Sequence, residues 1–313
     1  MKFTHISDFK LGRSVQGFYL CKEKHVRNTK NDNLYLDIIL SDATGSIPGK
    51  MWELADNFQD RFESGDPVAV KGKVGEFNDL LQLTVTQINL ASNELYGQYG
   101  FSPEKLFKKI DEPIVDLWNR LIKISNTLTS SCKDLVITII NMYKDKIQTM
   151  PYSVIHHPVR GGFLKHLVTT SEISIKILKH YPSLDRDLVL TGILLHNIGK
   201  VKSVNDDLVS GYTDEGKLIG HNVLGRDIVL RTARSIKKFP EDTLAKLEHI
   251  IVSHQSTTEK GYITIPRFPE ALFVHYIDEL DGRINMMLNA IENDPNMKWT
   301  DFQSKFKVEL FKK

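Results

Sequence analysis

The chain has little of several features that would assign it to a class at once. It holds only two cysteines in 313 residues, Cys21 and Cys132, and no apolar run that reaches the length of a membrane span. Two cysteines so far apart exclude a disulfide framework and a compact zinc finger, and they favour a reducing compartment. The N-terminal residues have no apolar signal-peptide core. We therefore expect a cytoplasmic protein without a membrane partner.

A large excess of charge of one sign is also missing. The formal net charge is +2, from 41 basic and 39 acidic residues. Bulk charge therefore cannot supply affinity for nucleic acid, and any such affinity must come from a local patch. The length and the 41% hydrophobic content leave room for two domains with cores of their own.

Histidine is scarce in the first half and concentrated in the second. Of 11 histidines, only His5 and His25 precede His156, and the remaining nine lie between His156 and His275. Most of them are tens of residues apart. This distribution is typical of a site assembled from several helices of a bundle.

Polar residues occupy apolar faces of the helices predicted there, as the spacing of His196, His221, His254 and Asp278 indicates. His254, for example, follows Leu247 and Ile251 on one helical face. A single histidine in such a place is more often a hydrogen-bonded core residue. Four polar groups together are costly to bury without a common partner, and a divalent cation is a partner that satisfies them directly.

The order of these residues resembles that of the HD-domain metal-dependent phosphohydrolases. The resemblance rests on His166, His196-Asn197, Gly199-Lys200, His221, His254 and Asp278. Flanking segments such as Gly161-Gly162-Phe163-Leu164-Lys165-His166 and Ile219-Gly220-His221 are similar to those of the YhaM-type 3′-to-5′ exoribonucleases. The similarity to that family extends over nearly the whole chain.

The resemblance implies a centre of two divalent ions of the Mn, Mg or Fe class. The ligands that it implies are His166, His196, Asn197, His221, His254 and Asp278. His221 and His254 would hold one ion and the remaining ligands the other, with position 197 bridging. In this family the metals generate a nucleophile from water and stabilise the charge of the phosphoryl transition state. Lys200 would neutralise a phosphate oxygen.

Asn197 departs from the family pattern, which has aspartate at this position. An amide offers one neutral oxygen, and its NH2 group repels cations, so we predict impaired metal binding or catalysis. Asparagine is also the near-isosteric replacement that an experimenter would choose to trap substrate. Engineered inactivation and natural divergence both remain open. Gln255 is a lesser departure, because relatives often have a second histidine there.

The first 92 residues have a different pattern, with short alternating segments and turn signals. Strands are predicted at residues 14–22, 33–41, 46–52, 67–77 and 80–90, with a helical piece at 53–62. Five strands with a helix after the third follow the element order of an OB-fold barrel. The predicted fold is therefore multidomain, an all-β OB-fold barrel followed by an all-α HD bundle.

An OB-fold binds single strands with aromatic platforms and basic residues. The stacking candidates are Phe18, Tyr35, Trp52 and Phe77, and the phosphate candidates are Arg27, Lys50, Lys71 and Lys73. An aromatic residue in a strand is more often part of a core. His156, His157 and Arg160, just before the first ligand helix, are further candidates for substrate contact.

We predict four segments: a barrel over residues 1–92, a helical brace over 93–150, an HD domain over 151–297 and an amphipathic tail over 298–313. Within the brace, helices are predicted at 103–109 and 115–146. In the tail, Trp299, Phe302, Phe306 and Leu310 recur at helical spacing. The tail would dock onto its own or a neighbouring subunit, as in a homo-oligomer, or contact nucleic acid.

These features together favour a metal-dependent 3′-to-5′ exonuclease of single-stranded RNA, with DNA as a second substrate. One alternative is an HD phosphodiesterase of small nucleotides, although mononucleotides need no strand-binding barrel. The other is a non-catalytic nucleic-acid-binding regulator. Asn197 favours that alternative, and the predicted cluster of buried histidines argues against it.

Overall fold

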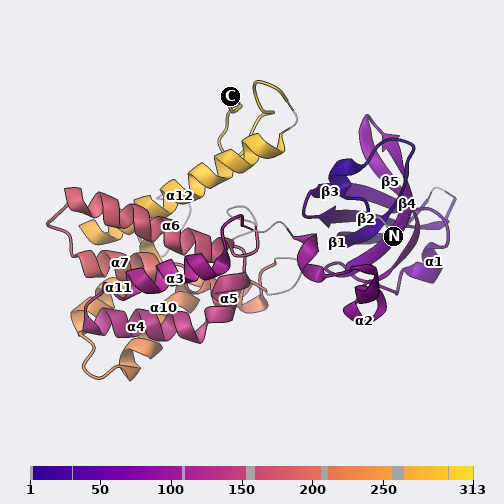
Figure 1. The fold of residues 1–313 in the computed structure, drawn as a ribbon. Helices are drawn as coiled ribbons and strands as arrows, with labels where there is room; N and C mark the ends of the chain where they lie inside the picture. Colours follow the sequence, from indigo (N-terminus) through magenta and orange to yellow (C-terminus); the bar gives the residue numbers. More distant parts are fainter. Residues whose placement is uncertain are drawn as a thin grey trace. The chain divides into compact units, whose positions relative to one another are not determined.

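The computed structural model describes residues 3–29, 31–107, 110–152, 159–205, 211–255, 264–294 and 296–312. The chain divides into two compact units between residues 109 and 110 (Figure 1). Each unit has a hydrophobic core of its own. The predicted division into four segments remains a prediction.

The first unit is a closed five-stranded barrel in the order β1-β2-β3-β5-β4. Its strands are β1 (Ser14–Asn28), β2 (Leu34–Asp42), β3 (Gly45–Met51), β4 (Pro67–Phe77) and β5 (Leu80–Leu90). A short helix, α1 (Ala55–Phe58), follows β3, and η1 (Ile6–Asp8) precedes β1. The predicted OB-fold and its element order, five strands with a helix after the third, are confirmed.

β1 runs further than the predicted end at residue 22. The pairing with β2 shifts between Cys21 and Glu23 and then continues to Asn28 opposite Leu34. A bulge of this kind bends a strand without ending its ladder. The alternation of apolar and polar residues could not show the continuation, because residues 23–28 are mostly exposed.

Short helical turns follow the barrel, α2 (Asn93–Tyr96), η2 (Gly97–Tyr99) and η3 (Pro103–Leu106). The helix predicted at 103–109 is thus one 3-10 turn over its described residues, and Ser102 makes no side-chain cap bond to it. Ala91, Phe101 and Leu106 form a small apolar cluster on this side of the barrel.

The second unit is a helical bundle, as predicted. Its first helices are α3 (Ile114–Ser125), α4 (Ser130–Met142) and α5 (Lys144–Thr149). They are followed by α6 (Gly162–Ile177), η4 (Leu178–His180), α7 (Arg186–Leu195), α8 (Lys200–Ser203), α9 (Asp214–Leu218), α10 (His221–Ser235), α11 (Glu241–Ser253) and α12 (Pro269–Asn293). The single helix predicted at 115–146 is therefore three helices, interrupted after Ser125 and at Tyr143.

α7 is the central helix of the bundle. Every residue from Leu188 to Leu195 is buried, because α4, α6, α11 and α12 all pack against it. Asp185 caps its N-terminus by accepting from the backbone N–H groups of Asp187 and Leu188. The residues that follow Leu195 therefore enter the middle of the unit.

The helical spacing predicted for the tail is wrong. Between residues 296 and 312 the backbone folds back on itself, with bridges from Trp299 to Phe311 and from Gln303 to Val308. Leu310 is buried, whereas Trp299 and Phe302 are exposed. Four apolar residues are too short a window to distinguish a helix from a reversing chain. Among the described residues, no helix is long and apolar enough to cross a membrane.

Candidate metal centre and nucleic-acid interface

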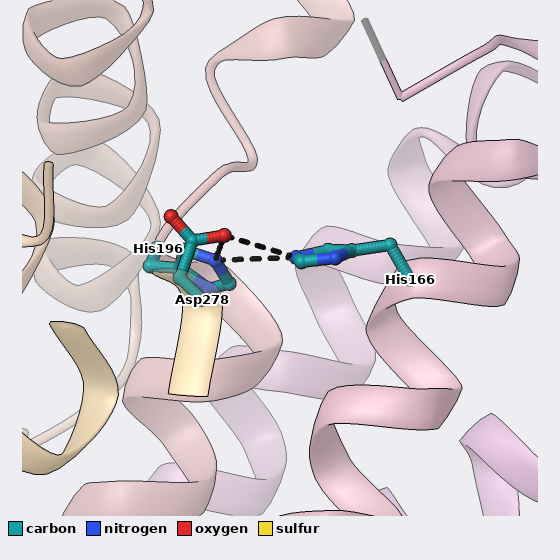
Figure 2. Close-up of side chains that lie close together, drawn as sticks. All are labelled: His166, His196 and Asp278. Carbon is teal, nitrogen blue, oxygen red and sulfur yellow. Dashed lines mark hydrogen bonds and ion pairs between the residues drawn. The ribbon is translucent and has the colours of Figure 1, made fainter. Parts of the chain in front are cut away.

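Three side chains from three separate elements meet in the interior of the helical unit (Figure 2). His166 projects from α6, His196 follows the last residue of α7, and Asp278 projects from α12. The Nε2 atoms of the two histidines are 3.4 Å apart, and Asp278 Oδ1 lies 3.4 Å from the first and 3.3 Å from the second. One ligand atom from each residue lies within 4.8 Å of the others, which is the spacing of a metal site.

Hydrogen bonds at Nδ1 fix the direction of each imidazole. His166 Nδ1 lies 2.7 Å from Asp281 Oδ2, and His196 Nδ1 lies 2.8 Å from the carbonyl oxygen of Ile193. Because a carbonyl oxygen can only accept, His196 Nδ1 carries the proton and its Nε2 presents a lone pair. This arrangement is the usual support of a metal-binding histidine.

Two further histidines extend the centre. The ring of His254 lies 4.9 Å from that of His196 and 5.7 Å from that of His221, centroid to centroid. His254 Nδ1 donates to the carbonyl oxygen of Ile251 over 2.7 Å. His221 Nε2, His254 Nε2 and Asn197 Oδ1 are buried and have no hydrogen-bond partner among the described residues.

Unpartnered buried polar atoms are rare and costly, so three of them among these described residues fit a common ligand such as a divalent cation. Burial lowers the pKa of His254 to about 3 and that of His221 well below its usual value, so both are neutral at pH 7. Burial alone would raise the pKa of Asp278, but positive charge at the facing side chains, first of all protonated His196 and His166, lowers it well below its usual value, and a bound cation would act in the same direction. Neutral imidazoles with an ionised carboxylate suit a divalent transition metal.

Asn197 lies at the same centre but forms bonds that a carboxylate could not form. Its Nδ2 group donates to the Tyr152 hydroxyl over 2.8 Å and lies 3.5 Å from Asp278 Oδ1. The Tyr152 hydroxyl in turn donates to Asp278 Oδ1 over 2.7 Å. The amide group therefore directs a donor toward the carboxylate that would bind a cation.

Sequence reasoning missed Tyr152 and Asp281. Tyr152 is fully buried, and its ring stacks on that of His166 at 4.0 Å between centroids. No periodic pattern marks Tyr152, because it lies in the segment between α5 and α6. Asp281 could have been found, since it lies three residues after Asp278 and therefore on the same helical face.

Lys200 lies at the edge of the centre, in the recess that borders it. Its Nζ is 4.1 Å from the centroid of the Tyr152 ring, and burial lowers its pKa to about 8 against the opposing effect of Asp278. The recess is lined by Tyr152, Lys200, Ser203, Val204, Gly211, Tyr212 and His221.

Gly199 allows the helix that carries His221 to approach. A Cβ atom at Gly199 would lie 1.9 Å from the carbonyl oxygen of His221 and 2.5 Å from the backbone nitrogen of Gly225. No other residue type permits this backbone contact.

The structure thus brings together five predicted ligand histidines and carboxylates around position 197: His166, His196, His221, His254 and Asp278. His156 and His157 lie outside the described residues, and Arg160 is half-buried just before α6. His275 donates from Nδ1 to the carbonyl oxygen of His254 over 2.6 Å, so it supports the end of α11.

On the barrel, Tyr35 and Trp52 form an aromatic pair at the surface, in which Trp52 is exposed and Tyr35 is partly buried. Their rings are stacked with centroids 4.7 Å apart, and Trp52 is 46% exposed. Lys50 Nζ lies 5.1 Å from the centroid of Tyr35 and 5.4 Å from that of Trp52. An exposed aromatic face beside an ammonium group is suited to a base and its phosphate.

Strand register links this pair to a basic row around the barrel. Lys50 is opposite Thr84 in β5, and Thr84 is opposite Lys73 in β4. The side chains of Lys71 and Lys73 both point outward, because they alternate with the buried residues of β4. Phe77, at the end of the same strand, is 62% exposed.

Phe18, another predicted stacking platform, is only partly exposed and packs against other rings. Its ring packs against Phe3, Tyr96 and Phe101, at centroid distances of 4.5, 5.5 and 4.9 Å. Tyr19, its neighbour, faces the barrel core. Adjacent strand residues point to opposite faces, so Phe18 points to the outside of the barrel, where these three rings pack against it.

Comparison with known proteins agrees with both units. Residues 163–283 match the HD domain, and residues 24–91 match an OB-fold nucleic acid binding domain. The fold and site thus define a protein with an OB-fold and a metal-dependent HD phosphohydrolase domain. The 3′-5′ exoribonuclease YhaM of Oceanobacillus iheyensis is 30% identical over 290 residues, which cover 90% of this chain and 88% of that protein. The chain belongs to the family of YhaM-type exoribonucleases.

Two solved structures with a likeness to part of the chain are a replication protein domain and a single-stranded DNA binding protein. The second OB-fold domain of replication protein A from Methanococcus maripaludis is 26% identical, and the match covers 29% of this chain and 96% of that domain with a TM-score of 0.24. A mitochondrial single-stranded DNA binding protein of S. cerevisiae, Rim1, is 18% identical over 26% of this chain and 96% of its own, with a TM-score of 0.22.

Proposed function

We propose that the chain is a metal-dependent 3′-to-5′ exonuclease of single-stranded RNA, in a form that Asn197 impairs. The observation that carries the proposal is a group of buried atoms that have no hydrogen-bond partner in the described part of the chain, His221 Nε2, His254 Nε2 and Asn197 Oδ1, beside the cluster of His166, His196 and Asp278. A pure binding protein has no use for such a group. The family relationship supports the reaction and its direction.

Hydrogen bonds hold two of the proposed ligand histidines, His166 and His196, in an orientation that suits a bound cation. His166, His196 and Asp278 would hold one ion, and His221 and His254 the second. Bound divalent ions supply an activated water and neutralise charge on the phosphate. The bonds from Nδ1 to Asp281 and to the Ile193 carbonyl keep the histidines aimed at the shared space. The two ions and the Mn, Mg or Fe class remain part of the proposal.

Lys200 is placed to bind a phosphate oxygen of the substrate. Its ammonium lies over the Tyr152 ring in a recess that also reaches His221. With a pKa of about 8, most of its population is charged at pH 7. A charge held in a buried site interacts with phosphate more strongly than one in water.

Asn197 weakens the centre in two ways. It removes the negative charge that would bridge two cations, and its Nδ2 group donates toward Tyr152 and Asp278. Both effects favour the metal-free arrangement of these side chains. This observation also favours the second candidate, a nucleic-acid-binding regulator without catalysis.

The barrel would hold the single strand. Trp52 and Tyr35 would stack with bases, and Lys50, Lys71 and Lys73 would bind phosphates, with RNA as the first substrate and DNA as the second. Self-association is a separate proposal, supported by exposed apolar side chains of the helical unit. The cytoplasmic location remains a prediction.

Labelled oligonucleotides distinguish the candidates. With Mn²⁺, Asn197→Asp should shorten a 5′-labelled RNA in single-nucleotide steps and release the label of a 3′-labelled RNA at once. The unchanged chain should bind the same RNA and cut it at least ~100-fold more slowly, since even residues that only support a metal site contribute ~10–100-fold. Internal cuts, or activity confined to mononucleotides, would contradict the proposal. Binding without cutting by both forms would favour the regulator.

A further inference from the structure

A charged cluster lies beside the aromatic pair of Tyr35 and Trp52, on the paired strands β1, β2 and β3 of the barrel (Figure 1). Asp37 in β2 is directly opposite Lys50 in β3, and Tyr35 is directly opposite Arg27 in β1. Directly opposite residues of antiparallel strands project from the same face. Tyr35 and Asp37 are the partly exposed positions of β2 here, and the residue between them is buried. The cluster and the aromatic pair therefore share the outer face of the barrel.

Asp37 is the centre of this cluster. Its Oδ2 atom lies 3.3 Å from Arg27 Nε, and its Oδ1 atom lies 3.7 Å from Lys50 Nζ. Both distances are longer than those of ordinary hydrogen bonds, so the carboxylate keeps lone pairs for a further donor. The Asp37 side chain is 25% exposed, which leaves that position open to a ligand on the outer face.

A carboxylate is unfavourable on a surface that binds only phosphates. It repels phosphate groups and offsets part of the positive charge of Arg27 and Lys50. A carboxylate can only accept hydrogen bonds, and the donors of a base lie on its edge. Asp37 is therefore suited to a base that stacks on the neighbouring rings and presents a donor group.

We propose that Asp37 accepts a hydrogen bond from the base stacked on Trp52 and selects cytosine over uracil at this position. The inference rests on the proposed function, in which the barrel binds the single strand. Trp52 follows Lys50 by two residues, so it is a diagonal neighbour of Asp37, about 7–8 Å away between Cα atoms. A base that covers the Trp52 ring can span this distance with its edge.

The chemistry of the two pyrimidines gives the selection. Cytosine carries the N4 amino group, a donor that aspartate accepts in direct base readout, whereas uracil has the acceptor O4 at the same place, as thymine does. An oxygen that faces the carboxylate is repelled and leaves it without its bond. Adenine carries the N6 amino group and should be accepted like cytosine.

Binding of oligo(C) and oligo(U) of equal length to the full chain tests the proposal. Fluorescence anisotropy without divalent ions measures both affinities, and no strand is cut under these conditions. The two strands have the same backbone and rings of similar size, so their phosphate contacts are alike. We expect the unchanged chain to bind oligo(C) ~10-fold more tightly, the effect of one hydrogen bond to a charged group.

Asp37→Asn should abolish this preference, because an amide offers uracil a donor as well as offering cytosine an acceptor. Oligo(U) should also bind more tightly than to the unchanged chain, since a negative charge is lost. If Asp37 only positioned Lys50, both affinities would fall together and their ratio would stay the same. Glu63→Gln is the matched control and should keep the ratio, because Glu63 pairs with Lys24 over 3.1 Å outside the cluster.

Equal affinities of the unchanged chain for the two strands would overturn the proposal, and so would a ratio that Asp37→Asn leaves unchanged. Trp52→Ala shows which idea has failed. If this variant binds both strands more weakly while the unchanged chain has no preference, the barrel binds the strand and only the role of Asp37 is wrong. If Trp52→Ala changes neither affinity, the strand does not bind on this face, and the proposed role of the barrel fails as well.

Discussion

At the scale of single residues, the chemistry depends on which atoms face the shared space between α6, α7 and α12. Sequence spacing predicted His196, His221, His254 and Asp278, because polar residues on apolar helical faces leave a visible pattern, and the family resemblance added His166. It could not predict Tyr152, whose contacts with Asp278 and Asn197 arise only from tertiary packing. It also could not predict how exposed Phe18 is, since exposure on the outer side of a barrel depends on which segment packs against that side.

Tyr152→Phe removes a hydroxyl and keeps the ring that stacks on His166. We expect a loss of about 1.5–3 kcal/mol of stability in the metal-free chain, because a buried carboxylate loses a donor. In the Asn197→Asp background the metal affinity should fall ~10–100-fold, as for other residues that support a ligand. Isothermal titration with Mn²⁺ and urea unfolding measure the two effects. Unchanged values of both would show that the hydroxyl has no role.

Lys200 should give the metal-free chain a distinct dependence on pH. Its pKa is about 8 when folded, against 10.5 in an ordinary setting. Between these values the unfolded chain binds more protons, so the free energy of unfolding should rise with pH, by on the order of 3 kcal/mol at most. Below pH 8 Lys200 is charged in both the folded and the unfolded chain, so folding bears the full cost of burying that charge. Lys200→Met should lose this rise when unfolding is followed from pH 7 to 10, and a curve identical to that of the unchanged chain would contradict the account.

At the scale of elements, the sequence predicted the strands of the barrel and the helices that carry the ligands. The alternation of Val68, Val70 and Val74 with outward residues is local information, so β4 was found with its observed bounds. The ends of α3, α4 and α5 were not found, because the breaks near Asn126 and Tyr143 contain no proline or glycine. The sequence also could not predict close contacts between elements, such as that between Gly199 and the backbone of α10.

Gly199→Ala should displace α10 and with it His221. The added Cβ would meet backbone atoms that cannot rotate away. We expect a loss of ~1–3 kcal/mol or more, the usual effect of overpacking, together with weaker metal binding. Gly97→Ala is the control, because a Cβ there meets nothing within 4 Å. Urea unfolding of both variants tests the contact, and equal stability of the two would refute it.

At the scale of the whole molecule, the two units have separate cores and separate tasks in the proposed function. Every proposed metal ligand lies at or after His166, and the aromatic pair of Tyr35 and Trp52 lies in the barrel. The sequence predicted this order of domains correctly. It could not show which apolar side chains of α12 are exposed, because the spacing of an apolar face does not tell whether another helix covers it.

Removal of residues 1–109 separates the two tasks. Long single strands should bind more weakly and with less dependence on salt, since stacking contributes about 1–3 kcal/mol per base and phosphate contacts release counterions. Hydrolysis of a small activated phosphodiester should survive in the Asn197→Asp background. If the small-substrate reaction is lost in a folded, metal-loaded protein, the barrel is part of the active site.

The metal content of the chain with Asn and with Asp at position 197 tests the central claim most directly. Both forms are dialysed against the same low concentration of Mn²⁺, and the ions per chain are counted by mass spectrometry alongside the rate of RNA shortening. We expect Asn197→Asp to bind more ions per chain and to gain activity by at least ~100-fold, because it restores the bridging carboxylate. Equal metal content and equal rates in the two forms would contradict the account.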